Sequence, residues 1–347
     1  MTFISSGFGI FEGYMLRFFK FCIVAVGLFS CETQEVKLQQ LLLKGNIALQ
    51  ASQFEQATYY YEEAIKLDSC FSDAWNNLGT ISFRSGQQDE AILRYDRAIS
   101  CKPDVAYYLN RANAHFENKS FFSVLQDLEI VEKIKKDSVP AMALKGLTLA
   151  RLLRYKEAYD LFSVIIKKDS LDPEHWVNRG TVSYYIKDYN RARPDLQKAL
   201  ELDSANSEAF NALAMISADE GSLDTAFDLI EQALKYSNDH PHYLNNRGYI
   251  RIIMGNLSEG EKDLNESMVR EPDNPWVYRN KGILYLKLGK NDSAEKLFRQ
   301  VLSMDSSVDK ASEYLGLTLI SSGKKSEGCS WLRKSSSIGL IKSNRCL

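Results

Sequence analysis

The chain has 347 residues and a formal net charge of −2 at neutral pH, from 43 Lys and Arg and 45 Asp and Glu. This balance provides no basic footprint for phosphate backbones, so it argues against nucleic acid as a partner. Hydrophobic residues make up 45% of the chain, which is typical of a globular protein with a sizeable core.

The first notable element is the apolar stretch "RFFKFCIVAVGLFSCET", residues 17–33. Its uninterrupted apolar run, residues 21–29, is far shorter than the roughly 20 residues of a membrane span, but it fits the core of a signal peptide. Arg17 and Lys20 precede the run, and Leu28-Phe29-Ser30-Cys31 ends it. This order resembles a bacterial lipoprotein signal, although Phe29 replaces the usual small residue. The resemblance implies cleavage before Cys31 and lipidation of this cysteine.

We therefore expect a signal peptide over residues 1–30, in which 1–14 precede an alternative start at Met15, and a lipidated tether over 31–37. Two acyl chains are enough for stable attachment. The resemblance to a lipoprotein signal further implies a location in the bacterial cell envelope, on the outer membrane and facing the periplasm. Two alternatives remain for the apolar run. It can form a short buried helix that caps the first repeat, or it can stay uncleaved as an anchor.

From about residue 38 onward the chain is an internal repeat. A small residue recurs at intervals of 33 or 34 residues, and a second small residue, usually alanine, follows twelve residues later. Aromatic residues such as Tyr61, Tyr95, Phe162 and Phe298 come four residues after the second marker. The first markers are Gly45, Gly79, Ala112, Gly146, Gly180, Ala214, Gly248, Gly282 and Gly316. Small residues at such spacing indicate close helix crossings, with two amphipathic helices of roughly 12 to 14 residues in each unit.

The segment "DAWNNLGTISFRSGQQDEAILRYDRAISCKP", residues 73–103, resembles the tetratricopeptide repeat (TPR) family nearly throughout. The resemblance covers residues 38–342 and leaves 343–347 as a tail. It implies an all-α, right-handed superhelical solenoid of about nine helix-turn-helix repeats, with a concave and a convex surface.

Six cysteines are present, of which Cys22 would leave with the signal and Cys31 would carry lipid. The other four stand near repeat ends, where Cys70 with Cys101 and Cys329 with Cys346 are candidate disulfides. The periplasm permits disulfides, but four free thiols remain the alternative, because sequence alone does not set connectivity.

No catalytic pattern is present: G-x-S-x-G, H-E-x-x-H and C-x-x-C are all absent. The segment "SSGKKS" at 321–326 lacks the first glycine of a phosphate-binding loop. His240 and His242 lie beside Asp239 at a predicted turn, but a metal site there would need further ligands. We therefore predict no enzyme activity, no cofactor and no metal site.

One pattern suggests binding. In five repeats an asparagine stands two residues before the small marker, and a basic residue follows four of them. Because the first helix lines the concave surface in TPR proteins, the resemblance implies a ladder of amides that can donate to and accept from a peptide backbone. The predicted groove residues are Asn77, Asn110, Asn178, Asn246, Asn280, Arg111, Arg179 and Arg247, with Tyr184, Tyr249 and Trp276 as exposed additions. The ladder is interrupted at Leu144 and Ala212. The alternative is that these asparagines bond neighbouring helices to each other.

The sequence thus predicts a non-enzymatic scaffold, anchored by lipid in the cell envelope, that binds a peptide or partner protein in its groove. The alternative function is a regulatory or substrate-docking subunit of an envelope enzyme, a glycan-export system or a secretion system.

Overall fold

The structure is a computed structural model that describes residues 34–335 and Cys346. The predicted signal peptide, Cys31 and most of the predicted tail lie outside these residues. Residues 34–50 are helical, so the first helix already includes part of the predicted tether. Helices are the only regular secondary structure in the described residues, which confirms the predicted all-α class.

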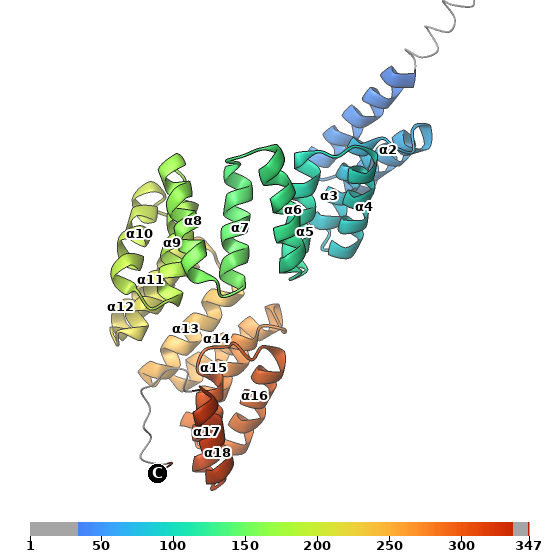
Figure 1. The fold of residues 1–347 in the computed structure, drawn as a ribbon. Coiled ribbons are helices and arrows are strands. Elements are labelled where there is room, and N and C mark those ends of the chain that lie inside the picture. Colours follow the sequence, from blue (N-terminus) through green and yellow to red (C-terminus); the bar gives the residue numbers. More distant parts are fainter. Residues whose placement is uncertain (1–33, 336–345, 347) are drawn as a thin grey trace, which may run out of the picture. The chain divides into compact units, whose positions relative to one another are not determined.

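Two compact units make up the chain, and the boundary between them falls between Arg154 and Tyr155. Unit 1 contains the helix at 34–50 and the helices up to α7, and unit 2 contains the helices from α8 onward (Figure 1). The helices of unit 1 are α2 (Phe54–Leu67), α3 (Ser72–Arg84), α4 (Gln88–Cys101), α5 (Val105–Glu117), α6 (Phe121–Ile134) and α7 (Val139–Arg151). Those of unit 2 are α8 (Tyr155–Lys168), α9 (Pro173–Tyr185), α10 (Tyr189–Leu202), α11 (Ser207–Asp219), α12 (Leu223–Tyr236), α13 (Pro241–Met254), α14 (Leu257–Arg270), α15 (Pro275–Lys287), α16 (Asn291–Met304), α17 (Ala311–Ser321) and α18 (Lys325–Ser335).

Each first helix of a pair ends at a residue with a left-handed backbone, which turns the chain into the second helix. Glycine adopts this conformation without steric cost, whereas Leu153, with φ of 60°, does so against the usual preference of an L-residue. The same turn therefore recurs with the period of the sequence. Its left-handed residues are Ser52, Gly86, Lys119, Leu153, Lys187, Gly221, Gly255, Gly289 and Gly323.

The small markers lie where the two helices of a pair cross. A Cβ atom at Gly79 would lie 2.6 Å from Cε1 of Tyr95, and one at Gly282 would lie 2.6 Å from Cε1 of Phe298. Both rings are fully buried. A larger first marker would therefore displace the ring that fills the pair, which explains why the glycine and the aromatic residue occur together, sixteen residues apart.

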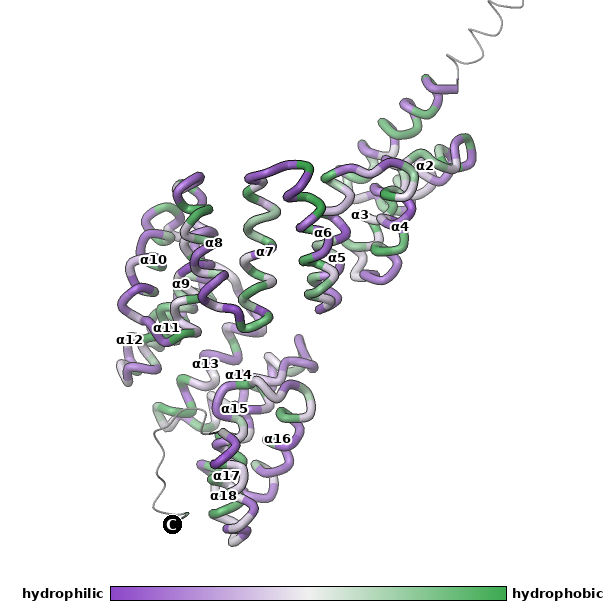
Figure 2. The backbone as a smooth tube through the Cα atoms, in the orientation of Figure 1, coloured by the Kyte–Doolittle hydropathy of each residue, from purple (hydrophilic) through white to green (hydrophobic). Residues whose placement is uncertain are grey.

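Within each unit the first helices form one continuous layer. In unit 1 α5 contacts both α3 and α7, and in unit 2 contacts run from α9 through α11, α13 and α15 to α17. No two second helices contact each other among the helices of the described ranges. The first helices thus form the inner layer of each stack, and the second helices form its outer layer (Figure 1). Both hydrophobic and hydrophilic residues occur along each of these helices, as expected for helices that bury one face (Figure 2).

Candidate functional site in the inner layer

In unit 1 the predicted asparagines bond the first helices of neighbouring repeats to each other. Nδ2 of Asn77 donates to Oδ1 of Asn46 at 2.8 Å, and Nδ2 of Asn110 donates to Oδ1 of Asn76 at 2.8 Å. The hydroxyl of Tyr61 also donates to Oδ1 of Asn46, at 2.7 Å. The first helices are therefore tied together by amide hydrogen bonds on the inner layer.

Unit 2 repeats this arrangement. Nδ2 of Asn246 donates to Oδ1 of Asn211, and Nδ2 of Asn280 donates to Oδ1 of Asn245, both at 2.8 Å. Asn280 is only 2% exposed, and its side-chain amide is used in this hydrogen bond. Asn178 has no side-chain hydrogen bond to any residue of the described ranges. Four of the five asparagines thus bond neighbouring helices, as the alternative reading of the ladder expected, and a direct contact with a peptide stays a prediction.

The three predicted groove arginines each form two parallel hydrogen bonds with an aspartate sixteen residues later, on the second helix of the pair. The pairs are Arg111–Asp127 at 2.5 and 3.0 Å, Arg179–Asp195 at 2.7 and 2.8 Å, and Arg247–Asp263 at 2.8 and 3.0 Å. All three aspartates are at most 5% exposed. Such bidentate pairs are among the stronger hydrogen bonds in proteins.

Each arginine also reaches back to the second helix of the preceding pair. Nη1 of Arg247, for example, lies 2.8 Å from Oε1 of Glu231. The hydrogen bonds with Asp127 and Asp195 raise the pKa of Arg111 and of Arg179 above the ordinary value. These contacts give the arginines a structural role between the helices, and a ligand contact for them stays a prediction.

The aspartate partners of these arginines were not predicted from the sequence. The signal was present, because an arginine with an aspartate sixteen residues later recurs every 68 residues, at 111, 179 and 247. This period is two repeats rather than one, so an alignment in single repeats does not show it.

The second missed residue is Arg279 on α15, which stands where other repeats hold Asn76, Asn211 or Asn245. It is 7% exposed. Its Nε donates to Oδ1 of Asn280 at 3.1 Å, and its Nη1 donates to the backbone oxygen of Asp309 at 3.3 Å. No carboxylate lies within ion-pair distance of its guanidinium group in the part of the chain that the structure describes.

Aromatic side chains surround Arg279 instead. Its guanidinium carbon lies 4.9 Å from the ring centre of Trp276 and 5.3 Å from that of Tyr249. Burial raises the pKa of Tyr184, and the charge of Asp219 adds to this rise. Burial also raises the pKa of Tyr314 to about 12. The charge of Arg279 opposes both shifts. We call Tyr184, Tyr249, Trp276, Arg279 and Tyr314 the aromatic–arginine cluster. It draws side chains from α9, α13, α15 and α17, and its three predicted aromatic residues are partly buried rather than exposed.

The four candidate cysteines are paired in the structure. Cys70 and Cys101 are joined with their Cα atoms 5.3 Å apart, which links the turn before α3 to the end of α4. Cys329 and Cys346 are joined with their Cα atoms 5.7 Å apart, which ties α18 to the C-terminal region. Both pairs match the candidate connectivity, and their redox state in the cell stays a prediction.

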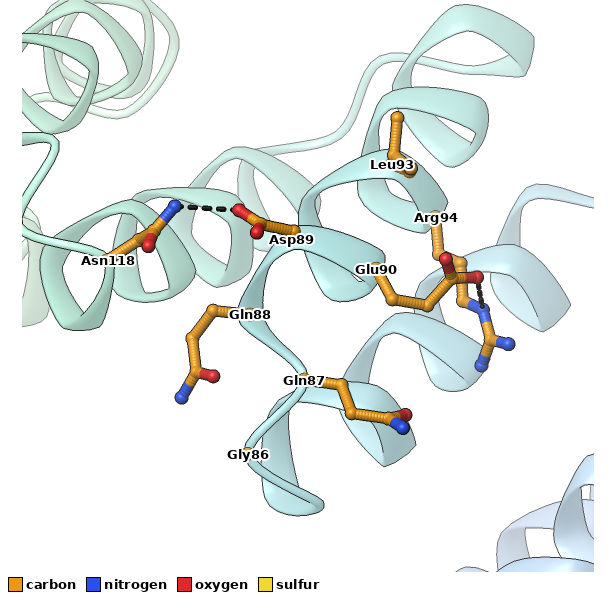
Figure 3. A pocket seen from close by; sticks show the side chains of 8 residues that line it. All are labelled: Gly86, Gln87, Gln88, Asp89, Glu90, Leu93, Arg94 and Asn118. Atoms are coloured by element: carbon orange, nitrogen blue, oxygen red, sulfur yellow. Dashed lines mark hydrogen bonds and ion pairs between the residues drawn. The ribbon is translucent and has the colours of Figure 1, made fainter.

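A shallow depression lies beside the turn between α3 and α4 (Figure 3). Its charged side chains are already engaged: Nδ2 of Asn118 donates to Asp89 at 2.8 Å, and Nε of Arg94 donates to Glu90 at 2.8 Å. The depression therefore lacks the convergent, unpaired polar groups that define a small-molecule site.

No helix within the described ranges has the length and apolar character that crossing a membrane requires. Because residues 17–33 lie outside those ranges, lipidation of Cys31 and the predicted location in the envelope stay predictions.

The repeat geometry agrees with a known family. A family model described as "Tetratricopeptide repeat" matches residues 42–106, 177–241 and 279–335, together more than half of the chain. The chain belongs to the tetratricopeptide repeat family. This family is in general a non-catalytic protein-interaction fold, and some of its members bind peptides.

Individual relatives are distant. The chain is 23% identical to a TPR repeat-containing protein of Methanocaldococcus jannaschii, over 88% of this chain and 59% of the relative. It is 22% identical to the Protein CTR9 homolog of Arabidopsis thaliana, over 78% of this chain and 29% of the relative. The chain thus spans less than two thirds of either relative. Among solved structures, one chain of the APC/C hetero-tetramer Cut9–Hcn1 superposes on this chain with a TM-score of 0.60 and is 14% identical to it in sequence. That match covers 80% of this chain and 55% of the other, and it shows the fold alone.

Proposed function

We propose that the protein is a non-enzymatic scaffold whose second unit binds an acidic segment of a partner protein at the aromatic–arginine cluster. The observation that carries this proposal is Arg279, a nearly buried guanidinium group without a carboxylate partner in the described ranges.

A buried charge is unfavourable unless another group compensates it. Two cation–π contacts supply about 0.5–2 kcal/mol each, and the two hydrogen bonds of Arg279 go to neutral oxygens. No hydrogen bond joins Nη2 to any described residue. The planar fork of an arginine suits a carboxylate, which can accept two parallel hydrogen bonds. An Asp or Glu side chain, or a C-terminal carboxylate, would complete this group.

The surrounding rings favour a polypeptide over a small anion. Trp276 and Tyr249 offer rigid apolar surface next to the guanidinium group, and such residues dominate the energetics of protein interfaces. The inner layer also continues from α9 to α17, so a partner segment can follow several first helices beyond the cluster.

The proposal includes attachment of the scaffold to the bacterial envelope through lipid on Cys31. The basic residues, the short apolar run and the Leu-Phe-Ser-Cys order at 28–31 support it. Disulfide pairing of Cys70 with Cys101 agrees with an oxidising compartment. We expect Cys31→Ala to give an uncleaved precursor that takes up no alkyne fatty acid. Equal labelling of this variant and the wild type would disprove the assignment.

The binding site is tested by a crosslinking pull-down from native membranes with wild type, Arg279→Gln and Lys281→Ala. Lys281 is the matched control, because it is a cation on the same helix whose Nζ bonds Asn265 of α14 at 2.8 Å. Loss of one charged hydrogen-bond pair costs about 1.5–3 kcal/mol, so recovery of the partner should fall by more than tenfold with Arg279→Gln alone.

Thermal melting separates binding from folding. Arg279→Gln removes a buried charge without a carboxylate partner, which favours folding, and also removes two cation–π contacts, which opposes it. The variant is therefore expected to melt near the wild-type temperature. Unchanged recovery of the partner with Arg279→Gln, or an equal loss with Lys281→Ala, would contradict the proposed site.

A further inference from the structure

His175, the third residue of α9, is a buried polar side chain that lacks a hydrogen-bond partner among the described residues. It is 5% exposed, and neither ring nitrogen has a hydrogen-bond partner among the described residues. Buried polar atoms are nearly always hydrogen-bonded in folded proteins, so such a side chain needs an explanation.

The repeat shows that this place does not require a histidine. His175 lies five residues before the first marker Gly180, and in most other repeats the equivalent position holds an apolar side chain. Its occupants elsewhere are the exposed Gln40 and Ala74, Tyr107, Ala141, Ala209, Tyr243, Val277 and Ala311. Both tyrosine hydroxyls are hydrogen-bonded, Tyr107 to Asp73 at 2.5 Å and Tyr243 to Ser207 at 3.3 Å. His175 therefore differs from the other eight, because it buries two polar atoms without a hydrogen bond for either.

Two carboxylates of the preceding turn face the ring. Asp169, Asp172 and His175 each offer one ligand atom, and these atoms all lie within 4.8 Å of one another. Each aspartate accepts one backbone hydrogen bond through Oδ1, which shapes the turn. Oδ1 of Asp169 accepts from the N–H of Leu171 at 3.2 Å, and Oδ1 of Asp172 accepts from the N–H of Glu174 at 2.9 Å. These bonds fix both carboxylates and leave their second oxygens for another partner.

We propose that Asp169, Asp172 and His175 form a binding site for a divalent transition-metal cation, with Zn²⁺ as the ion of choice. Nε2 of His175 lies 3.6 Å from Oδ2 of Asp172, which is too long for a hydrogen bond. Two ligand atoms of one tetrahedral Zn²⁺ ion, with bonds of about 2.0–2.2 Å, lie roughly 3.3–3.5 Å apart. The observed separation thus suits a shared ion after a small contraction.

The donor set also selects the ion. Imidazole nitrogen suits Zn²⁺, whereas Mg²⁺ and Ca²⁺ take oxygen ligands. Three protein ligands leave the fourth tetrahedral position for water or for a group of a partner. The turn itself is braced, because Nε1 of Trp176 donates to the backbone oxygen of Ser170 at 3.0 Å. A bound ion would tie the turn between α8 and α9 to the first residues of α9.

The chain offers a matched control in another turn of the same kind. Nε2 of His242 lies 3.3 Å from Oε2 of Glu271, but this ring is half exposed and also lies 3.2 Å, through Nδ1, from Nδ2 of Asn274. His242 is thus a histidine beside a carboxylate that already has a partner.

The test is calorimetric titration of Zn²⁺ into the chelator-treated full chain, with wild type, His175→Ala, Asp172→Asn and His242→Ala. His175→Ala should fold, because alanine fills this place in four other repeats. Asp172→Asn retains an acceptor for the cap of α9 and removes the charge. Loss of a residue that only supports a metal ligand weakens metal binding about 10–100-fold. Loss of the ligand His175 itself should therefore weaken Zn²⁺ binding by about 100-fold or more. We expect one Zn²⁺ site that depends on His175 and Asp172 and is unchanged in His242→Ala.

Substitution with Co²⁺ gives a second measurement that reports ligand geometry. Visible absorption bands of tetrahedral Co²⁺ are expected in wild type and His242→Ala and should be absent in His175→Ala. Three results would overturn the proposal: no Zn²⁺ binding by the wild type, which would leave only a histidine–aspartate ion pair; equal binding by wild type and His175→Ala; or loss of binding in His242→Ala alone.

Discussion

The Arg179–Asp195 pair provides a quantitative test of what holds a repeat together. Both side chains are largely buried, since the side-chain atoms alone are 16% exposed in Arg179 and 8% exposed in Asp195. Asp195→Ala would leave the guanidinium group without its two bonds to carboxylate oxygens. Removing one partner of a buried ion pair costs about 3–5 kcal/mol of unfolding free energy. Arg179 keeps a bond to Ser163 at 3.2 Å and a cation–π contact with Trp176 at 5.2 Å, so we expect a loss near 3 kcal/mol.

The chain itself suggests the compensating change. At the equivalent places, repeat six holds Leu213 and Leu229, which lie in or against buried hydrophobic clusters. The double variant Arg179→Leu/Asp195→Leu should therefore have a free energy of unfolding within about 1 kcal/mol of that of the wild type, because hydrophobic replacement of a buried ion pair is often neutral or stabilising. The double variant would then be more stable than Asp195→Ala by about 2 kcal/mol.

Urea denaturation followed by far-UV circular dichroism measures both free energies of unfolding, provided that the denaturant slopes agree. The reasoning would be refuted if Asp195→Ala unfolds within about 0.5 kcal/mol of wild type. It would also be refuted if the double leucine variant is no more stable than Asp195→Ala.

Three further predictions follow from the packing. Asn246→Ala with Asn280→Ala should lower stability by about 1–3 kcal/mol in total, because two inter-repeat amide bonds are lost, and unchanged thermal melting would contradict this. Ala199→Phe should destabilise unit 2 by about 1–3 kcal/mol, since Ala199 is fully buried at a helix crossing, and wild-type urea unfolding would show that the crossing is not close. Cys70→Ser with Cys101→Ser should cost about 2–4 kcal/mol under oxidising conditions, because the loop of 31 residues is no longer closed in the unfolded chain, and it should cost little under reducing conditions; equal losses in both would argue against a disulfide.

The sequence predicted the helices and their crossings well, because these depend on local spacing. Gly79 and Tyr95 mark one crossing, and Gly282 with Phe298 marks another by the same steric rule, so their roles could be predicted from the period. The cysteine pairs were candidates for a similar reason, since the register places Cys70 near Cys101.

The roles of polar side chains were harder to predict. The register correctly placed Asn246 on a first helix, but it did not reveal that Asn211 accepts a hydrogen bond from the side-chain amide of Asn246. Arg247 was expected in the groove because it follows Asn246, yet its partner Asp263 lies on the second helix. The environment of Arg279 depends on side chains from several first helices, and no spacing within one repeat encodes it.

We propose that a partner's acidic segment lies against the aromatic–arginine cluster of unit 2. The most direct measurement is to place a photo-crosslinking amino acid at Tyr249, irradiate native membranes and identify the crosslinked peptide of the partner by mass spectrometry. We expect a segment with an Asp, a Glu or a C-terminal carboxylate within a few residues of the crosslink, and loss of this crosslink in Arg279→Gln. A crosslinked segment without a carboxylate, or a crosslink that persists at the wild-type level in Arg279→Gln, would overturn the proposed binding site.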